Sequence, residues 1–421
     1  MKLNKIFITF FLLVYSVQVN AFSIMIPMDE ASQKNHLKAY GIAFWTLQNG
    51  LTMQWLLNYR GGSFLLPQSK AIEEECIVRG VSYEILTDGQ TAQILNEISQ
   101  PEANMDALKL EKAPRIAVYS PKTLQPWDDA VTMVLTYAEI PYTIIYDEEI
   151  IQGDLTKFDW LHLHHEDFTG QYGKFYAAYR NAAWYKQEVA GQSNSASKLG
   201  FMKVSQMKLF VAKTIKDFVS KGGFLFAMCS ATDTYDICLA SDGVDICESM
   251  FDGDGADPSA QQKLNYDNCF AFKNFSLAMN PMIYEFSDID VTNTRRISRD
   301  NDFFTLFDFS AKWDPVPTML CQNHSNLIKG FMGQCTAYNK TLIKSSALVM
   351  GEFKSANEAR YIHGEFGKGT WTYFGGHDPE DYQHFVGDPP TDLNLYPNSP
   401  GYRLILNNIL FPAAKKKKLK T

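Results

Sequence analysis

The stretch from Gly222 to Tyr235, GGFLFAMCSATDTY, constrains the fold of this chain more than any other. A short apolar run, Phe224 to Met228, is typical of a buried strand, and it leads directly into Cys229 and then into a helical pattern. The residues two before and two after the thiol, Ala227 and Ala231, are small, as a sharp turn from strand to helix requires. The pattern therefore predicts that Cys229 stands on a tight turn above the edge of a sheet.

The position of Cys229 also indicates a chemistry. A thiol at the first turn of a helix lies at the positive end of the helix dipole, which favours the thiolate, the form that attacks carbon. We therefore interpret Cys229 as a candidate nucleophile. Buried cysteines at strand ends are also common and unreactive, so a structural thiol is the alternative interpretation.

A second motif, TWTYFGGHDPE from Thr370 to Glu380, carries the groups that a nucleophilic cysteine needs. A hydrophobic strand ends there in a Gly-Gly turn, and His377 follows, with Asp378 and Glu380 close behind it. Cysteine catalysis requires an imidazole within hydrogen-bonding reach of the sulfur and a carboxylate that fixes the orientation of that imidazole. The segment therefore offers His377 as a base and two carboxylates that can orient it.

A strand that ends in a cysteine elbow, followed much later by a strand that ends in His, Pro and Glu, resembles the class I glutamine amidotransferase-like superfamily. The resemblance covers roughly residues 114–412 and implies Cys229 as the nucleophile and His377 as the base. It implies Glu380 as the first choice for the orienting carboxylate and Asp378 as the second. Alanines stand here where the superfamily usually has glycines around the cysteine, and Glu380 follows the histidine by three residues rather than two.

A third cluster of polar side chains lies in the segment DWLHLHHEDFTGQYG, where His164, His165 and Glu166 come at the end of a predicted strand. Ligands of open α/β sheets bind at such strand ends, so we interpret the cluster as part of a substrate pocket. Hydrogen-bonded core histidines are one alternative. A metal site is another, since the following side chains are of the types that bind zinc: His164, His165, Glu166 and His377. By resemblance, Gly170 and Gly173 would supply the backbone N–H groups of an oxyanion hole.

Strand-like and helical patterns alternate through most of the chain, which predicts an α/β fold with a doubly wound, mostly parallel sheet. The resemblance makes that sheet flavodoxin-like. The predicted organisation is a signal peptide at 1–21, an N-terminal α/β unit at 22–110, an amidotransferase-like domain at 112–412 and a basic tail at 413–421. About 140 residues separate the cysteine motif from the His377 motif, more than one crossover needs, so we expect an insertion after the elbow at about 240–345.

The amino terminus indicates where the protein resides. Lys2 and Lys5 precede the apolar run IFITFFLLVYSV, and small residues around Ala21 follow it. This is typical of a cleavable signal peptide, and no later stretch is long and uncharged enough to cross a membrane. We therefore expect an exported protein, in the periplasm or outside the cell, with no transmembrane segment. The KKKKLK sequence near the carboxyl end is typical of a solvated terminus.

Charge and motifs narrow the range of partners. Lys and Arg number 39 against 47 Asp and Glu, a net charge of −8, which argues against nucleic-acid binding. No phosphate-binding loop occurs, and we expect no cofactor. A small molecule, a peptide or a glycan is the expected ligand.

Seven cysteines in an exported chain raise the question of disulfide bonds. If Cys229 is the working thiol, an even number remains. We expect Cys321 to pair with Cys335 first, and Cys247 with Cys269 second.

Three functions remain open at this stage. The first is a cysteine amidohydrolase that acts on an amide or related carbonyl. The second is a non-catalytic protein that binds a carbohydrate or peptide, similar to the ThuA-like branch of the superfamily. Aromatic side chains near the third cluster suit stacking on sugars or packing in a core: Trp160, Phe168, Tyr172, Phe175, Tyr176 and Tyr179. The third is a metal-dependent hydrolase that uses the His164, His165 and Glu166 cluster.

Exported chains of this kind from Bacteroidetes-like bacteria are often labelled asparagine synthetase B. Such a synthetase resembles an amidotransferase with an amino-terminal cysteine, joined to an ATP pyrophosphatase. Removal of residues 1–21 would expose Phe22 instead of cysteine, and no Ser-Gly-Gly-x-Asp-Ser loop is present. The motifs therefore do not predict ATP-dependent asparagine synthesis.

Overall fold

The computed structural model describes residues 22–122, 125–383 and 385–414. The predicted signal peptide at 1–21 lies outside the described residues, as does the tail from Lys415 onward. Within the described ranges, no helix is both long enough and apolar enough to span a membrane.

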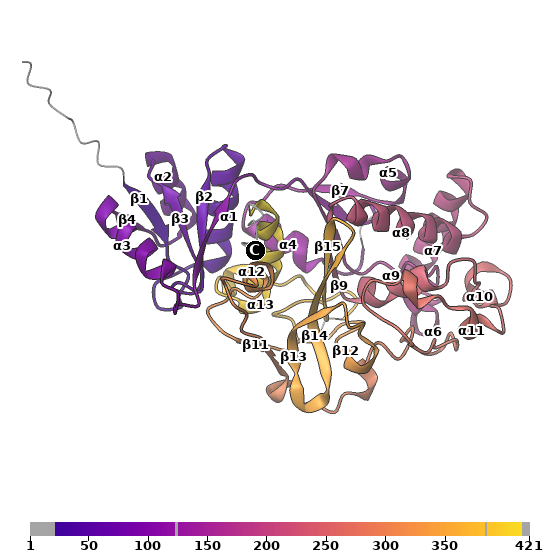
Figure 1. Ribbon diagram of the computed structural model, residues 1–421. Coiled ribbons are helices and arrows are strands. Elements are labelled where there is room, and N and C mark those ends of the chain that lie inside the picture. The colour runs from indigo at the N-terminus through magenta and orange to yellow at the C-terminus, as the bar shows by residue number, and fades with distance from the viewer. Residues whose placement is uncertain (1–21, 123–124, 384, 415–421) are drawn as a thin grey trace, which may run out of the picture.

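The N-terminal unit contains a five-stranded sheet in the order β4-β1-β3-β2-β5, drawn in indigo and purple in Figure 1. All of its pairings are antiparallel. Its strands are β1 (Ser23–Ile26), β2 (Met53–Leu57), β3 (Ser63–Pro67), β4 (Glu84–Leu86) and β5 (Asp106–Leu110). Its helices are α1 (His36–Gln48), α2 (Lys70–Arg79) and α3 (Asp88–Ser99), and side chains of Asn35, Ser69 and Thr87 cap their amino ends.

One half of the larger sheet is parallel and runs β7-β6-β8-β9-β15. These strands are β6 (Ile116–Tyr119), β7 (Thr143–Ile145), β8 (Trp160–Leu163), β9 (Phe224–Met228) and β15 (Gly369–Phe374), and each pairs in parallel with its neighbour. Numbered by their order in the chain, the five strands lie in the spatial order 2-1-3-4-5. Parallel pairing brings all of their carboxyl ends to one edge of the sheet.

The other half of this sheet is antiparallel. β14 (Glu358–Phe366) pairs with β15, and β13 (Leu348–Phe353), β10 (Phe303–Leu306) and β11 (Leu327–Lys329) extend the sheet beyond it. β12 (Tyr338–Asn339) pairs with β14. β10, β11 and β12 come from the region predicted as an insertion at about 240–345, and β13 and β14 follow it. The fold is therefore mixed α/β, with a sheet that is parallel in one half only.

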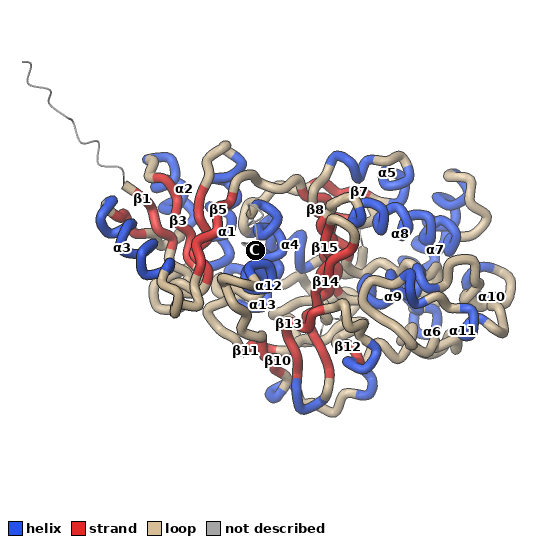
Figure 2. The backbone as a smooth tube through the Cα atoms, viewed as in Figure 1, coloured by secondary structure: helices blue, strands red, loops and turns tan. Residues whose placement is uncertain are grey.

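Helices cover both faces of the larger sheet, as Figure 2 shows. α4 (Ala130–Tyr137) and α13 (Pro400–Leu410) share one hydrophobic cluster with α1 of the N-terminal unit and with Phe226 and Met228 of β9. On the other face, α8 (Val204–Ser220) and α9 (Ser230–Ala240) pack against Leu225 and Ala227 of the same strand. The alternation of side chains along β9 thus divides its residues between two cores, which explains its continuous apolar sequence.

The remaining helices are short, apart from α7, and lie in the connections. They are α5 (Asp147–Ile151), α6 (Tyr176–Tyr179), α7 (Ala183–Lys198), α10 (Ser249–Asp252), α11 (Ala260–Lys263) and α12 (Pro315–Leu320). α6 and α7 fall between β8 and α8, next to the parallel strand ends.

All seven cysteines are free thiols, so both predicted disulfide bonds are wrong in this structure. The thiols of the second predicted pair, Cys247 and Cys269, form hydrogen bonds with separate backbone carbonyls. Cys247 donates its S–H to the carbonyl of Thr169 at 3.2 Å, and Cys269 donates to the carbonyl of Asp236 at 3.3 Å. Spacing in the sequence did not reveal these separate positions, because the pairing of cysteines depends on the tertiary fold.

Candidate active site

Cys229 occupies a strained turn between β9 and α9. Its backbone has φ 55° and ψ −140°, a region that residues with a side chain rarely adopt. Ala227 and Ala231 on either side are completely buried. The predicted sequence of strand, cysteine turn and helix is confirmed, and the turn places Cys229 at the carboxyl edge of the sheet.

The two strands beside β9 bring histidines to the same place. His377 follows β15 and the pair His164 and His165 follows β8, so β9 lies between the two sources of imidazole. The end of β8 is also tied to the start of α9. The Ala231 N–H donates to the carbonyl of His164 at 2.9 Å, and the Ser230 hydroxyl donates to the carbonyl of His165 at 2.8 Å.

Gly376 makes the turn that carries His377 over the sheet. Its φ is 102°, and a Cβ there would lie 2.4 Å from the Phe331 ring. The resulting cluster is tight: the ligand atoms of His164, His165, Cys229 and His377 all lie within 4.8 Å of one another. Parallel strand pairing therefore assembles residues that are more than 200 positions apart in the chain.

Two carboxylates that sequence analysis did not single out stand behind the imidazoles. Asp128 Oδ1 lies 3.3 Å from His377 Nε2, and the backbone carbonyl of Asp128 accepts a hydrogen bond from His165 Nε2 at 2.6 Å. Asp129 Oδ2 lies 3.3 Å from His164 Nδ1. Both acids lie just before α4, in the connection that follows β6, the strand next to β8. Their acidic side chains near a strand end were the sequence signal that could have identified them as site residues.

The two carboxylates predicted to orient His377 have other recorded partners. Glu380 accepts a hydrogen bond from the Ser399 hydroxyl. Asp378 accepts from the Thr391 hydroxyl at 2.8 Å and from the Glu380 N–H at 2.8 Å. These bonds join the loop after His377 to the segment that leads into α13. The carboxylate that forms an ion pair with His377 is that of Asp128.

The predicted oxyanion glycines have structural roles. The Gly173 N–H donates to Asp167 at 3.1 Å, and a Cβ at Gly170 would lie 2.8 Å from the backbone of Ser205. The N–H groups of Ser230 and Gln334 reach the sulfur of Cys229 and act to lower its pKa. Ser230 follows the nucleophile directly, which is the usual place for an oxyanion donor, whereas Gln334 comes from a loop that no motif marked.

Glu166 is separated from the metal-type cluster by its own bonds. Its carboxylate accepts from the Tyr146 hydroxyl at 2.8 Å and lies 3.9 Å from the ammonium of Lys208. Burial raises the pKa of Glu166 to about 7. The cluster of four ligand types therefore contains Cys229 in the place that the sequence suggested for Glu166.

Burial dominates the electrostatics of the cluster. It raises the pKa of Cys229 to about 12, although the two N–H groups oppose the shift. It lowers the pKa of His164 to about 4 and that of His165 well below its ordinary value. At neutral pH the resting thiol is therefore protonated, and these two imidazoles are uncharged. This differs from the thiolate that the helix dipole alone would favour.

A cavity of about 300 Å³ opens over Cys229, Ser230 and His377. Aromatic side chains form much of its lining: Trp127, Phe175, Tyr179, Tyr284 and Phe385. Trp160 and Phe168, which the sequence offered for ligand stacking, are buried in the two cores beside the sheet. The cavity suits a small or narrow ligand with an apolar surface.

Comparisons with known proteins assign no family to this chain. No family model matches it, and neither does any curated protein. Among solved structures, it is similar to a cytoplasmic protein from Salmonella typhimurium at 11% identity, with a TM-score of 0.33 over 76% of this chain and 93% of that one. A second Salmonella typhimurium LT2 cytoplasmic protein gives 12% identity and a TM-score of 0.33, over 72% of this chain and 100% of that one. A GH42 beta-galactosidase gives 12% and 0.28, over 63% of this chain and 28% of that one. Similarities at these TM-scores carry no functional argument.

Proposed function

We propose that this chain is a cysteine hydrolase that cleaves an amide or related carbonyl bond. The observation that carries the proposal is the strained turn at Cys229, with φ 55°, beside His377 at the end of the neighbouring strand. A left-handed backbone at a residue that carries a side chain costs free energy, and such strain gathers at functional sites. The N–H groups of Ser230 and Gln334 at the sulfur add a second element of acyl-transfer sites.

We further propose that the site stands on a flavodoxin-like sheet similar to that of class I glutamine amidotransferases. The spatial order 2-1-3-4-5 of the five parallel strands supports this, because it is the order of flavodoxin-like doubly wound sheets. In such sheets ligands bind at the carboxyl ends of the strands, where Cys229 and His377 lie. Export of the protein remains part of the proposal and rests on the sequence of residues 1–21.

The reaction would begin when a carbonyl compound enters the aromatic cavity above Cys229. His377 takes the proton of the thiol as the sulfur forms a bond to the carbonyl carbon, and the N–H groups of Ser230 and Gln334 stabilise the oxyanion. The C–N bond then breaks, and the amine leaves with the proton held by His377. Water, deprotonated by His377, attacks the thioester and releases the acid and the thiol.

Asp128 is a positioning residue in this scheme. Its carboxylate lies 3.3 Å from Nε2 of His377, so it orients the ring and stabilises the imidazolium that forms after proton transfer. The raised pKa of Cys229 determines when the thiol passes its proton to His377. Because the resting thiol keeps its proton, the thiolate would form only as the substrate is attacked.

An acyl-transfer assay tests the proposal without knowledge of the natural substrate. 4-Nitrophenyl acetate acylates nucleophilic cysteines, and the product is coloured. We expect a burst of 4-nitrophenolate, one acetyl group on Cys229 by peptide mass spectrometry, and loss of both in Cys229→Ala. Equal release of product by the wild type and Cys229→Ala would refute the nucleophile. Short acyl 4-nitroanilides then test for amide cleavage.

A metal-dependent hydrolase is a second candidate, and the ligand cluster favours it. Three imidazoles and a thiol with ligand atoms within 4.8 Å of one another match the donor types of zinc sites. His164 Nε2 is buried and has no hydrogen-bond partner within the described ranges. Asp128 and Asp129 would then hold the imidazoles from behind, as carboxylates and carbonyls do around bound metals.

Metal analysis separates the two candidates. The second one predicts about one equivalent of zinc in protein purified without chelator, and loss of both metal and activity in His164→Ala. The cysteine hydrolase predicts that protein treated with a chelator keeps its esterase activity. Zinc added to that protein would then inhibit it, because the metal would occupy the nucleophile.

A further inference from the structure

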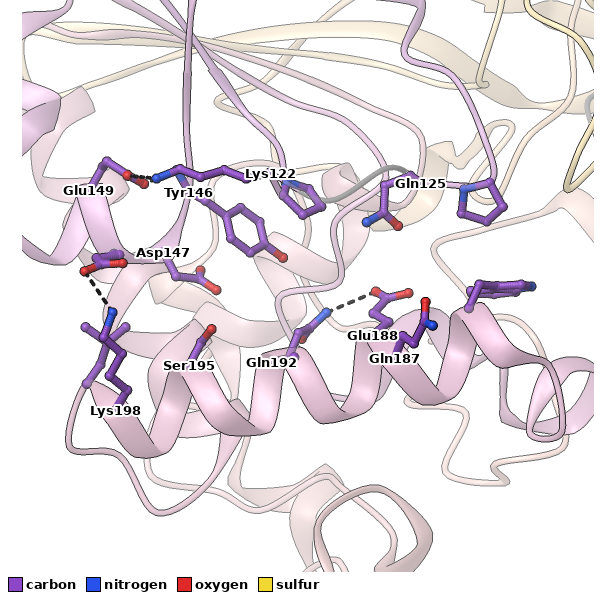
Figure 3. Close-up of a pocket in the computed structure, with 16 residues that line it drawn as sticks. Lys122, Gln125, Tyr146, Asp147, Glu149, Gln187, Glu188, Gln192, Ser195 and Lys198 are labelled. Carbon is purple, nitrogen blue, oxygen red and sulfur yellow. Dashed lines mark hydrogen bonds and ion pairs between the residues drawn. The ribbon is translucent and has the colours of Figure 1, made fainter.

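A second cavity of about 300 Å³ lies between α7 and the loop that follows β6, and none of the predicted site residues lines it (Figure 3). The loop contributes Lys122 and Gln125, and α7 contributes Glu188, Gln192 and Ser195. Figure 3 shows Gln125 above and Glu188 below, directed toward the same space. We refer to it as the α7 cavity.

Among the described residues that line the α7 cavity, all charged side chains but one form ion pairs within the protein. Among the lysines, Lys122 forms an ion pair with Glu149, and Lys198 lies 3.4 Å from Glu148. The carboxylate of Asp147 forms an ion pair with the ammonium of the buried Lys208 at 3.0 Å. These pairs leave no lining lysine to neutralise a further acid.

Glu188 is that further acid. Its Oε1 accepts a hydrogen bond from Gln192 Nε2 at 3.0 Å, whereas its Oε2 is buried and has no hydrogen-bond partner in the described part of the chain. Burial and the nearby carboxylate of Glu166 raise the pKa of Glu188 to about 7. A buried carboxylate oxygen without a donor is costly, and a cation placed beside it would relieve that cost.

Aromatic rings complete the wall of the cavity. Tyr146 and Trp184 both line it, and the Trp184 ring packs edge-on against Trp127 at a centroid distance of 5.3 Å. Trp127 in turn lines the cavity above Cys229. The two cavities are therefore separate neighbours on either side of this contact. Rings beside an unpaired carboxylate suit an organic cation, which aromatic faces attract.

We propose that the α7 cavity binds a small aliphatic amine, whose ammonium group is held by Glu188. Gln187 offers an amide oxygen, and Ser195 a hydroxyl, for the remaining N–H groups of the ligand. The site does not depend on the hydrolase reaction, because Cys229 and His377 lie in the other cavity.

Calorimetric titration of the mature protein with 1,4-diaminobutane tests this site, with 1,4-butanediol as the uncharged probe of equal length. We expect the diamine to bind and the diol not to bind. Glu188→Gln should weaken diamine binding at least tenfold, since it removes the charge and keeps the shape. Cys229→Ala should bind the diamine as the wild type does, so failure of the hydrolase proposal leaves this one testable.

A second variant fills part of the α7 cavity and leaves the carboxylate of Glu188 in place. A Cβ at Gly191 on α7 would meet no atom within 4 Å, so Gly191→Leu would project into the open cavity. It should also weaken diamine binding at least tenfold, and Gly191→Ala is the matched control with a smaller effect. Absence of diamine binding in a protein that melts normally would overturn the proposal. Equal binding by Glu188→Gln, or binding of the diol as tightly as the diamine, would also overturn it.

Discussion

The cavities on the two sides of the Trp127 and Trp184 contact have similar volumes but different chemistry. The Cys229 cavity presents a thiol and an imidazole to a ligand, and the carboxylate of Asp128 stands behind the ring of His377. The α7 cavity is lined by Glu188, and neither a cysteine nor a histidine is among its described lining residues.

The difference follows from the elements that build each cavity. Parallel strand ends hold side chains on a rigid sheet, and strain at Cys229 can be maintained there because both cores fix β9. The α7 cavity lies between a helix and a loop, which present polar groups with less constraint. The first arrangement suits reacting groups, and the second suits reversible binding of a charge.

The largest effect is expected from Cys229→Ala. The account predicts a loss of at least about 10³-fold in hydrolysis of 4-nitrophenyl acetate, because the thiol of Cys229 forms the acyl bond. Diamine binding in the α7 cavity should not change. Cys238→Ala, which removes a buried thiol from α9, is the control and should keep the activity. Retained turnover in Cys229→Ala would contradict this account, because Cys229 would then not be the nucleophile of its cavity.

The next largest effect concerns Asp147, which lines the α7 cavity. Asp147→Ala leaves Lys208 buried without its carboxylate and should lower the free energy of unfolding by about 3–5 kcal/mol in urea denaturation. Asp242→Ala, which removes the partner of the exposed Lys213, should cost less than about 1 kcal/mol. Similar losses in the two variants would show that the Asp147 pair is not buried in solution.

A smaller effect is expected for the carboxylate behind the imidazole. Asp128→Asn should lower kcat by about 10- to 100-fold and change the pH profile, because the imidazolium loses its partner. Glu380→Gln is the comparison, since the resemblance to amidotransferases favours that residue. We expect a minor change there, because Glu380 is bonded to Ser399. A larger loss in Glu380→Gln would restore the prediction made from the sequence.

The smallest effect is a pH dependence of stability that belongs to the α7 cavity. Burial raises the pKa of Glu188 from an ordinary 4.5 to about 7, so the folded state holds a proton that the unfolded state has lost. The free energy of unfolding should therefore fall as pH rises from about 4.5 to 7, by an amount of the order of 1 kcal/mol. Glu188→Gln should flatten this decline in urea titrations at several pH values. An unchanged slope would contradict the assigned burial.

The sequence predicted the local structure around Cys229 and the relative place of His377. Both depend on short patterns, an apolar run followed by a turn, that are readable within about ten residues. The pairing of His377 with Asp128 could not be predicted in this way, because 249 residues separate them and only the strand order brings them together. The sequence pointed instead to Glu380, which is close to His377 in the chain but is hydrogen-bonded to Ser399.

Other differences have similar causes. The region after α9 was expected as an insertion, yet its strands extend the larger sheet, which the sequence does not indicate because edge pairing is a long-range contact. Trp160 and Phe168 pack in the cores instead of facing a ligand, since an apolar pattern does not tell which face of a strand meets a cavity. The α7 cavity has no motif at all and depends on how a helix lies against a loop.

The most direct test of the central claim is the rate at which iodoacetamide alkylates Cys229 between pH 5 and 9, in chelator-treated wild type and in His377→Gln. With a pKa of about 12, an unassisted thiol would react tenfold faster with each pH unit over this range. The account predicts that the wild-type rate instead levels off within this range, because His377 assists the attack as a base, and that His377→Gln restores the tenfold rise. A wild-type profile that rises throughout, unchanged in His377→Gln, would show that Cys229 is a structural thiol and contradict the account.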